Sequence, residues 1–318
     1  MKKYNIGIDL GGTTVTAGLV DGENHIIEKL TWDTNLPRPA DDLERHMAAL
    51  CRAVVEKAGL AFDCVESVGI GTPGSVNNQT GFIGFNANFG YHDWDLGKNM
   101  EALLGCKVYV ENDANAAAYG EYIAGSAQGA GSAVCITLGT GIGGGIILNG
   151  KIYTGSNGAG GEVGHTVIVM NGRPCMCGRN GCWEKYGSAR ALAEDSEAAA
   201  KKHPESRLAM LMAAKGKANA KMAFDAAAEG DETAKNVLDA WFQGVGCGLV
   251  NMINTFQPDI VCVGGGVSAQ GDVLLKPLQA ILDAEDYNRG GSHRTVLKVA
   301  SLMNDAAVVG GATLHLQH

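Results

Sequence analysis

Two stretches of this chain decide its fold, and they resemble each other across a shift of 128 residues. The first is Asp9-Leu-Gly-Gly-Thr-Thr-Val-Thr-Ala-Gly-Leu-Val-Asp-Gly22, and the second is Thr137-Leu-Gly-Thr-Gly-Ile-Gly-Gly-Gly-Ile-Ile-Leu-Asn-Gly150. Each is typical of a strand, a glycine/threonine turn, a second strand and an Asp-Gly or Asn-Gly hairpin. Because the match is mostly glycine and aliphatic, coincidence between two hairpins is the competing explanation. We interpret it as two similar domains, each presenting a backbone-lined turn.

The segments around these stretches alternate between strand and helix patterns. Apolar spacing and Gly59 predict a helix over 40–58, and the Ala, Lys, Glu and Met-rich segment 188–248 is helical by propensity. Further helices are expected at 96–104, from 114 onward, and at 306–316. The predicted strands lie at 4–9, 15–20, 26–32, 65–70, 107–111, 260–263 and 296–300. This alternation predicts an α/β protein.

Composition excludes several classes of protein. The chain has 318 residues, enough for about two domains, and 46 glycines but only 7 prolines, with 46% hydrophobic residues. Such a chain can build large cores, so disorder and collagen are excluded. A net charge of −9 and the absence of any Lys/Arg run longer than two predict no nucleic-acid partner. No signal peptide or long apolar segment is visible, so we expect no membrane association and a cytoplasmic location.

The two glycine/threonine turns suit phosphate. Main-chain amides without side chains can approach phosphate oxygens, and threonine hydroxyls add hydrogen bonds. The candidate residues are Gly11, Gly12, Thr13 and Thr14 in the first turn and Gly139, Thr140 and Gly141 in the second. No P-loop is present, since no Gly-Lys pair is followed by Ser or Thr. The segment 139–144 matches the dinucleotide pattern, but a strand and hairpin follow where that motif requires a helix.

Two aspartates are candidates for phosphoryl-transfer chemistry. Asp9 ends a strand just before the first turn, where a carboxylate can hold Mg²⁺ against phosphates; the alternative is a surface turn residue. Asn112 and Asp113 lie between a strand and a helix, where Asx residues are ordinary N-caps. The functional interpretation is that Asp113 accepts a hydroxyl proton, with the helix N-terminus keeping it ionised.

A cysteine cluster predicts a metal site. His165 is followed at spacings of ten, two and five by Cys175, Cys177 and Cys182. One imidazole and three thiolates form a closed tetrahedral set typical of structural Zn²⁺, and the surrounding glycines permit tight turns. The alternative is three reduced core cysteines, although Cys-x-Cys in a polar glycine loop is a poor core pattern. The other six cysteines resemble small buried residues, and an odd total of nine argues against a disulfide framework.

Taken together, these segments resemble the ROK family (repressor, open reading frame, kinase) of sugar kinases and sugar-responsive repressors. The resemblance runs along nearly the whole chain. It rests on Asp-Leu-Gly-Gly-Thr at 9, Gly-Thr-Pro-Gly at 71, Asn-Asp-Ala-Asn at 112, Leu-Gly-Thr-Gly-Ile-Gly-Gly-Gly at 138, Glu-x-Gly-His at 162, the cysteine motif, and Val-Gly-Gly-Gly at 263.

The resemblance implies an actin-like ATPase, ribonuclease-H-like fold of two α/β domains around a central cleft. We expect a small domain of residues 1–111 plus about 303–318, and a larger domain of 112–302 with the zinc motif at 165–182. The family's ATP would lie against the glycine turns and Gly265, with Mg²⁺ at the phosphates. Asp113 would be the catalytic base, and the sugar contacts would be Asn88, Asn112, Asp113, Glu162, His165 and Glu184.

One segment departs from the family pattern. Such kinases commonly show Asn-Leu-x-x-Trp, whereas this chain reads Asn86-Ala-Asn88-Phe-Gly-Tyr-His-Asp-Trp94. Either Asn86 or Asn88 can supply the sugar contact, and we prefer Asn88. His165 would bind zinc through one ring nitrogen and face the sugar with the other.

The resemblance implies an ATP-dependent kinase for the 6-hydroxyl of a hexose, with glucose preferred, and a homo-oligomer, either a dimer or a tetramer. N-acetylmannosamine, N-acetylglucosamine, allose and fructose are alternative substrates. A sugar-sensing repressor of the same family is a second hypothesis, which we disfavour because only eight residues precede Asp9. A zinc-stabilised sugar-binding module without catalysis is a third.

Overall fold

The computed structural model describes residues 3–86, 88–216 and 218–318. Contacts within the chain divide it into two compact units. Unit 1 contains the residues up to Ala133 together with Gly145–Gly161 and Ser301–His318, and unit 2 contains Val134–Gly144 and Glu162–Ala300. The domain boundaries expected from the family resemblance stay a prediction.

The first sheet has the strand order β3-β2-β1-β4-β8. Its first three strands form the expected antiparallel meander, and β4 and β8 continue it in parallel with β1. The strands are β1 Tyr4–Leu10, β2 Thr14–Val20, β3 Ile26–Asp33, β4 Val65–Thr72 and β8 Lys107–Asn112. A smaller sheet, β5-β6-β7, consists of Val76–Asn77, Phe82–Asn86 and Tyr91–Trp94.

The second sheet has the order β11-β10-β9-β12-β13. Its strands are β9 Ser132–Leu138, β10 Ile142–Leu148, β11 Lys151–Ile152, β12 Ile260–Gly264 and β13 Val296–Val299. When 128 is added to the residue numbers of β1 and β2, their first and last residues become those of β9 and β10, respectively. In each sheet this pair of strands is joined by a three-residue turn and followed on the far side by parallel strands. The structure therefore confirms the strand–turn–strand interpretation of both stretches.

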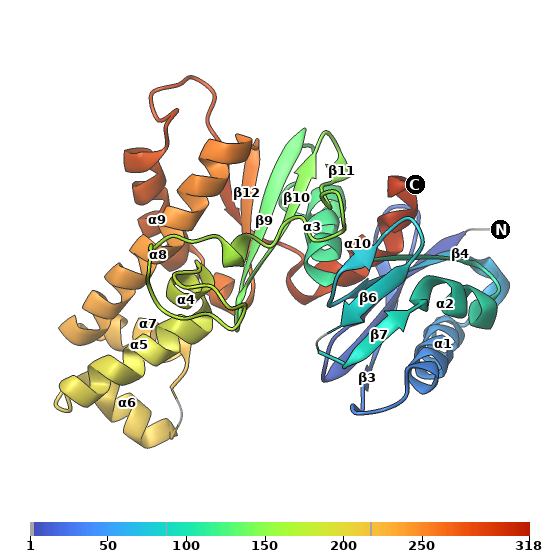
Figure 1. The fold of residues 1–318 in the computed structure, drawn as a ribbon, viewed down its shortest axis with the longest axis horizontal. Helices are drawn as coiled ribbons and strands as arrows, with labels where there is room; N and C mark the ends of the chain where they lie inside the picture. The colour runs from blue at the N-terminus through green and yellow to red at the C-terminus, as the bar shows by residue number, and fades with distance from the viewer. Residues whose placement is uncertain (1–2, 87, 217) are drawn as a thin grey trace. The chain divides into compact units, whose positions relative to one another are not determined.

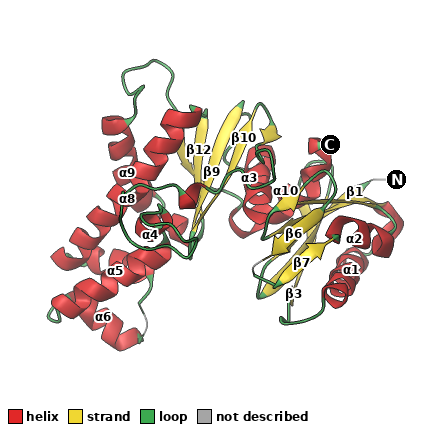
Figure 2. Ribbon diagram, in the orientation of Figure 1, coloured by secondary structure: helices red, strands yellow, loops and turns green. Residues whose placement is uncertain are grey.

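The helices, drawn in Figures 1 and 2, occupy every predicted segment and include two, at 184–187 and 272–285, that the sequence did not predict. They are α1 Ala40–Lys57, α2 Leu96–Leu104, α3 Asp113–Ala124, α4 Glu184–Gly187, α5 Ala189–Lys202, α6 Arg207–Lys215, α7 Ala220–Ala228, α8 Glu232–Phe256, α9 Asp272–Glu285 and α10 Ala306–Thr313. The last helix was expected to reach residue 316, but the α-helix ends at Thr313, whose hydroxyl donates to the carbonyls of Val309 and Gly310. A 3-10 turn, Leu314–Gln317, follows. No helix in the described ranges combines the length and apolarity needed to span a bilayer.

The first sheet buries its two faces in different ways. Side chains alternate along β1, so Ile6, Ile8 and Leu10 join the apolar face of α1 in one core cluster. On the opposite face of the sheet, β1 has Gly7 and β4 has Gly69. A Cβ atom on Gly7 would lie 1.7 Å from the Val308 carbonyl oxygen, and one on Gly69 would lie 1.9 Å from that of Gly311. The backbone of α10 therefore rests directly on the backbone of the sheet.

Helix α10 also packs backbone to backbone against α3. A Cβ atom on Gly120 of α3 would lie 2.1 Å from the Ala306 carbonyl oxygen, and one on Gly310 of α10 would lie 1.7 Å from that of Ala116. Every residue of α10 is buried, which explains its Ala-Ala-Val-Val-Gly-Gly-Ala-Thr composition. This contact fixes the position of α3 within unit 1, and the first residue of α3 is Asp113.

We predict that Gly310→Ala destabilises the protein by at least about 2 kcal/mol, because the new methyl group overlaps main-chain atoms that cannot move independently. The helix propensity gained from alanine, about 1 kcal/mol, does not offset this overlap. Urea denaturation measures the difference. Gly22→Ala is the matched control, since open space surrounds Gly22, and we expect no loss of stability there. Equal stability of both variants would contradict the close packing.

Candidate active site

The carboxyl ends of three parallel strands align the first group of candidate residues. Asp9 of β1 lies opposite Gly71 of β4, and Gly71 lies opposite Glu111 of β8. Asp113 follows two residues later. A Cβ atom on Gly71 would be 3.5 Å from the Asp113 Cα and 3.1 Å from the Ala116 Cβ, so the glycine lets α3 begin against the sheet. Ligands of α/β proteins bind at such strand ends.

The sequence left open whether Asn112 or Asp113 caps α3, and the structure shows that Asn112 does. Asn112 is the N-cap of α3, since its side-chain oxygen accepts hydrogen bonds from the amides of Ala114 at 2.9 Å and Asn115 at 3.3 Å. Asp113 is the first helical residue, and its Oδ1 accepts from the Ala114 amide at 2.9 Å. The helix N-terminus was expected to keep Asp113 ionised. Instead, burial raises the pKa of Asp113 and outweighs these amide contacts.

Asp9 is perturbed in the same direction. Burial, and after it the negative charge of Asp113, raises the pKa of Asp9 to about 6. Two neighbouring carboxyl groups whose pKa values are both raised suit a divalent cation, which would favour the ionised forms.

The two turns present exposed small and hydroxyl residues. In the first, Gly12, Thr13 and Thr14 are exposed, and the Gly11 amide donates to the Thr14 carbonyl at 3.0 Å. In the second, Thr140 is exposed, and the Gly139 amide donates to the Gly141 carbonyl at 3.0 Å. Both turns therefore have the character predicted from the sequence.

Asn86 and Asn88 differ sharply in their surroundings. Asn86 is fully buried; its Nδ2 donates to the Pro73 carbonyl at 2.7 Å and its Oδ1 accepts from the amides of Asn88 and Phe89. Asn88 is exposed. Asn86 thus holds the loop together, and its amide group is committed to that loop, which favours Asn88 as the residue that meets a ligand.

Glu111 is a buried carboxylate that the sequence analysis did not single out. It accepts hydrogen bonds from the Asn112 amide at 2.8 Å, from Asn115 Nδ2 at 3.0 Å and from Asn78 Nδ2 at 3.1 Å. Burial raises its pKa. Its place at the end of a buried strand, directly before Asn112 and Asp113, is the signal that could have revealed it. It fixes the main chain from which the catalytic candidate extends.

Unit 2 contains a cavity of about 450 Å³ beside its glycine turn. Its wall is mainly apolar. It is formed by the turn residues Gly139 and Thr140, by Ala189 at the start of α5, by Asn219, Lys221 and Phe224 of the α7 segment, and by Gly266, Val267 and Gln270. Gly265 supports this wall with a φ of +84°, and a Cβ atom there would lie 2.5 Å from the Leu138 carbonyl oxygen. An apolar cavity next to a phosphate-type turn suits a nucleotide base and ribose.

The α7 part of this wall was missed by the sequence analysis. Segment 188–248 read only as helical, and an apolar residue such as Phe224 looks the same in a helix whether it faces a core or a ligand. The signal that could have found it is Asn219, which caps α7 by accepting from the Met222 amide at 3.2 Å. A capped helix start marks a loop, and loops carry binding residues.

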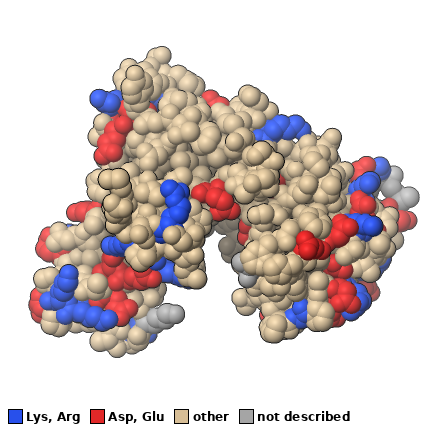
Figure 3. All heavy atoms as spheres, in the orientation of Figure 1, with Lys and Arg blue, Asp and Glu red and all other residues tan. Residues whose placement is uncertain are grey.

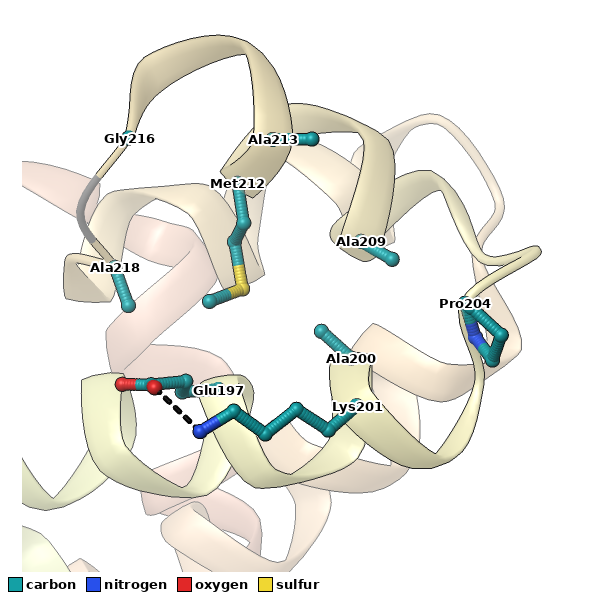
Figure 4. Close-up of a pocket in the computed structure, with 9 residues that line it drawn as sticks. All are labelled: Glu197, Ala200, Lys201, Pro204, Ala209, Met212, Ala213, Gly216 and Ala218. Carbon is teal, nitrogen blue, oxygen red and sulfur yellow. Dashed lines mark hydrogen bonds and ion pairs between the residues drawn. The ribbon is translucent and has the colours of Figure 1, made fainter.

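A second cavity of about 450 Å³ lies among α5, α6 and the segment before α7 (Figure 4). Alanine, proline and methionine side chains line most of it. Its two charged residues, Glu197 and Lys201, pair with each other at 2.7 Å. None of the predicted site residues lines this cavity, and its charges are already neutralised. This cavity is therefore a weaker nucleotide candidate than the cavity beside the glycine turn.

The predicted metal ligands come together in unit 2. One donor atom from each of His165, Cys175, Cys177 and Cys182 lies within 4.8 Å of all the others. The Cys177 and Cys182 Sγ atoms are 3.5 Å apart, and Cys175 Sγ is 3.6 Å from His165 Nδ1. Tetrahedral zinc with Zn–S bonds of about 2.3 Å separates its sulfurs by about 3.8 Å, so the donor set and its spacing fit zinc.

The thiols of the cluster have different pKa values. Burial raises the pKa of Cys175 and of Cys182, whereas the hydrogen bond from the Arg179 amide lowers the pKa of the exposed Cys177. Metal binding requires thiolates and so would release protons. Of the six cysteines outside the cluster, four are buried as expected, while Cys106 and Cys247 are only half-buried.

Glu184 links the cluster to the glycine turn. Its Oε1 accepts from Cys175 Sγ at 3.1 Å and lies 4.0 Å from His165 Nδ1. A Cβ atom on Gly141 would lie 2.7 Å from its Oε2, so a side chain at 141 would displace the carboxylate. Glu162, three residues before His165, is exposed. Unit 2 thus groups Glu184, His165 and the second turn.

Charged side chains outside these groups are mixed in sign. On the face drawn in Figure 3, basic and acidic residues are interspersed over both units. Many of them form exposed pairs, such as Lys3 with Glu66 at 2.8 Å. Such pairs stabilise a fold little, and the interspersed pattern differs from the one-sided basic surface of nucleic-acid binders.

The family model that matches this chain is that of the ROK family, over residues 5–318. The chain belongs to the ROK family. It is 38% identical to a glucokinase of Streptomyces coelicolor over 317 residues, which are 97% of this chain and 96% of that protein. It is also 27% identical to the xylose repressor of Bacillus subtilis, over 99% of this chain and 77% of the repressor.

A solved structure agrees with the sequence comparisons. The crystal structure of a ROK family glucokinase from Streptomyces griseus, in complex with glucose and AMPPNP, matches with a TM-score of 0.81 at 36% identity. The match covers 99% of this chain and 100% of that chain. The predicted fold class, an α/β protein of the actin-like ATPase type, is confirmed.

For this ROK protein we predict one tightly bound zinc ion per chain, lost in Cys177→Ser. Serine removes one thiolate from an exposed position without opening a cavity, so the variant should fold but hold metal at least about tenfold more weakly. Elemental analysis of the purified proteins measures the zinc content. Cys106→Ser, a half-buried thiol outside the cluster, should keep the metal. A wild-type protein that binds no zinc from zinc-containing buffer would contradict the site.

We predict that Asp9→Asn stabilises the protein at pH 7.5 and not near pH 4. The pKa of Asp9 is about 6 in the folded protein, against 3.8 for the ordinary group. The folded state therefore binds the proton more tightly, and ionisation costs stability as the pH rises through 4 to 6, by up to about 3 kcal/mol above that window. Asparagine avoids this cost. Urea denaturation of both proteins at the two pH values tests it, and a stability difference independent of pH would exclude burial as its cause.

Proposed function

We propose that this chain is an ATP-dependent glucokinase, which transfers the γ-phosphoryl group of ATP to the 6-hydroxyl of glucose. The observation that carries the proposal is Asp113, a partly buried carboxylate of raised pKa at the head of α3, with Asp9 as its charged neighbour. The relatives named glucokinase support it through their identity over nearly the full length of both chains.

Asp113 acts as the general base in this proposal. It accepts the proton of the 6-hydroxyl as that oxygen forms a bond to the γ-phosphorus. The bond between the γ-phosphorus and the bridging oxygen breaks, and ADP leaves with that electron pair. A carboxylate whose pKa is raised by burial accepts a proton more readily than an exposed one.

In this proposal Asp9 and the two turns bind the nucleotide and its metal ion. Mg²⁺ bound with ATP would neutralise the charge on the transferring phosphoryl group, and Asp9 would hold the ion directly or through water. Gly11, Gly12, Thr13 and Thr14 would contact the phosphates, as would Gly139, Thr140 and Gly141. The cavity beside the second turn, with Gly265 in its supporting wall, would take the adenosine.

Amide, carboxylate and imidazole side chains would recognise the sugar hydroxyls. We assign this role to Asn88, Asn112, Glu162, His165 and Glu184 in addition to Asp113. Because the Oδ1 of Asn112 caps α3, the group left for a sugar is the second hydrogen of its Nδ2, whose first hydrogen is directed at the Gly74 carbonyl 3.5 Å away. A site that pairs its polar groups with substrate hydroxyls rejects sugars that lack them, since the unpaired groups would stay desolvated.

Zinc has a structural role in this proposal. His165, Cys175, Cys177 and Cys182 would hold it, and the imidazole would bind through Nδ1, the nitrogen near Cys175 Sγ. That orientation directs Nε2 away from the metal and towards a substrate hydroxyl. The predicted dimer or tetramer stays a prediction.

We predict that the protein phosphorylates glucose with MgATP and that Asp113→Asn lowers kcat by about a thousandfold or more, because the general base is lost. Glucose binding, measured by calorimetry, should change by less than about threefold. Asp63→Asn is the matched control and should keep full activity, because Asp63 is exposed and lies before the start of β4, at the opposite end of that strand from the site. A coupled assay over glucose, mannose, fructose, allose and the two N-acetylhexosamines measures preference.

Three outcomes would overturn parts of this proposal. Faster turnover of another hexose would replace glucose as the substrate. Sugar binding without turnover of any hexose, by zinc-loaded protein, would favour the repressor or the non-catalytic binding module. An Asp113→Asn variant that keeps more than about a tenth of the wild-type kcat would remove Asp113 as the base.

A further inference from the structure

Thr34 is a fully buried threonine that the catalytic scheme does not use. It directly follows β3, and both of its hydrogen-bond donors reach the first glycine/threonine turn. Its Oγ1 donates to the Gly11 carbonyl at 2.8 Å, and its amide donates to the Thr13 carbonyl at 2.8 Å. A buried residue thus holds two carbonyl groups of an otherwise exposed turn.

These two bonds orient the turn. In a trans peptide the C=O and the following N–H point in opposite directions. A Gly11 carbonyl directed at the buried Thr34 hydroxyl therefore directs the Gly12 amide away from Thr34. Gly12 is exposed, and the Gly11 amide is occupied by the Thr14 carbonyl at 3.0 Å. The Thr34 hydroxyl thereby fixes the orientation of the Gly11–Gly12 peptide, in which the Gly12 N–H is free to donate to an anion.

The second turn uses the same device with a different donor. The carbonyl of its first glycine, Gly139, accepts a hydrogen bond from the Ala189 amide at 2.9 Å, at the start of α5. Gly139 corresponds to Gly11 across the 128-residue shift. The same carbonyl is therefore held in both turns, by a side chain in unit 1 and by the main chain in unit 2. Recurrence with unrelated donors indicates that the peptide orientation itself is what both turns require.

We propose that Thr34 is a positioning residue for the nucleotide phosphates, acting through the Gly11–Gly12 peptide and not by contact with ATP. The proposal rests on the proposed kinase function, because it takes the triphosphate as the anion at this turn. The hydroxyl is the essential group: the amide of residue 34 bonds to Thr13 whatever the side chain, whereas only a hydroxyl at this position reaches the Gly11 carbonyl.

The test replaces the hydroxyl and keeps the shape. Thr34→Val removes Oγ1, and Thr34→Ser retains it. Thr31→Val is the matched control, because Thr31 is exposed on the same hairpin and its hydroxyl pairs with Thr16 Oγ1 at 2.9 Å, away from the turn. We expect Thr34→Val to raise the KM for MgATP and the Kd for AMPPNP about tenfold, the factor of one hydrogen bond to a charged group. The KM for glucose should change less than about twofold.

Thr34→Ser should lie within about twofold of wild type in both nucleotide measurements, and Thr31→Val should be unchanged. Wild-type nucleotide affinity in Thr34→Val would overturn the proposal. So would parallel losses for nucleotide and sugar without rescue by serine, which indicate a general structural role. If Thr34→Val fails to fold, Thr34→Ala takes its place against the same serine variant. AMPPNP calorimetry needs no turnover, so a failure of the glucokinase assignment is distinguishable from a failure of this role.

Discussion

The buried contact of α10 with the first sheet and with α3 is the constraint on which unit 1 depends. Glycines at Gly7, Gly69, Gly120 and Gly310 bring main chain against main chain, at separations where any Cβ atom would overlap a carbonyl oxygen. Close-packed interiors deform little, so this contact places α3, and with it Asp113, on the carboxyl ends of β4 and β8. The last segment of the chain thereby determines where a catalytic candidate near residue 113 lies.

Burial has opposing effects at this site. Desolvation raises the pKa of Asp9, Glu111 and Asp113, so each ionised carboxylate opposes folding. The protein offsets part of this cost with donors: three hydrogen bonds reach Glu111, and a helix-terminal amide reaches Asp113. Sites that bind cations and move protons commonly retain such perturbed groups at the expense of stability.

The two glycine turns illustrate how a repeated motif can be supported differently in its two copies. Both turns use small residues to expose peptide groups, and both hold the carbonyl of their first glycine from behind. In unit 1 the donor is a buried hydroxyl that follows β3, and in unit 2 it is a helix amide. The second copy also has the zinc-type cluster beside it, with Glu184 lying between Cys175 and Gly141. Similar turns are therefore embedded in dissimilar surroundings.

The sequence did not indicate β5, β6, β7 or α9, but by itself it located most other elements, the two turns and the four residues of the His165 cluster. Each depends on spacing within one short segment: alternation along strands, a 3.6-residue period along helices, or cysteines within eight residues. The sequence also located the N-cap of α3 at residues 112–113. It left open which of Asn112 and Asp113 caps the helix and which is the candidate base.

The tertiary structure decided what depends on segments far apart in the chain. It separated Asn86, which its own loop occupies, from the exposed Asn88. It reversed the expected effect on Asp113, because desolvation by surrounding elements exceeds the influence of the helix terminus. It brought α7 to the second turn and Thr34 to the first, and it revealed Glu111 as a buried anchor. Burial and long-range hydrogen bonds are properties of the packed chain, and no local pattern of residues encodes them.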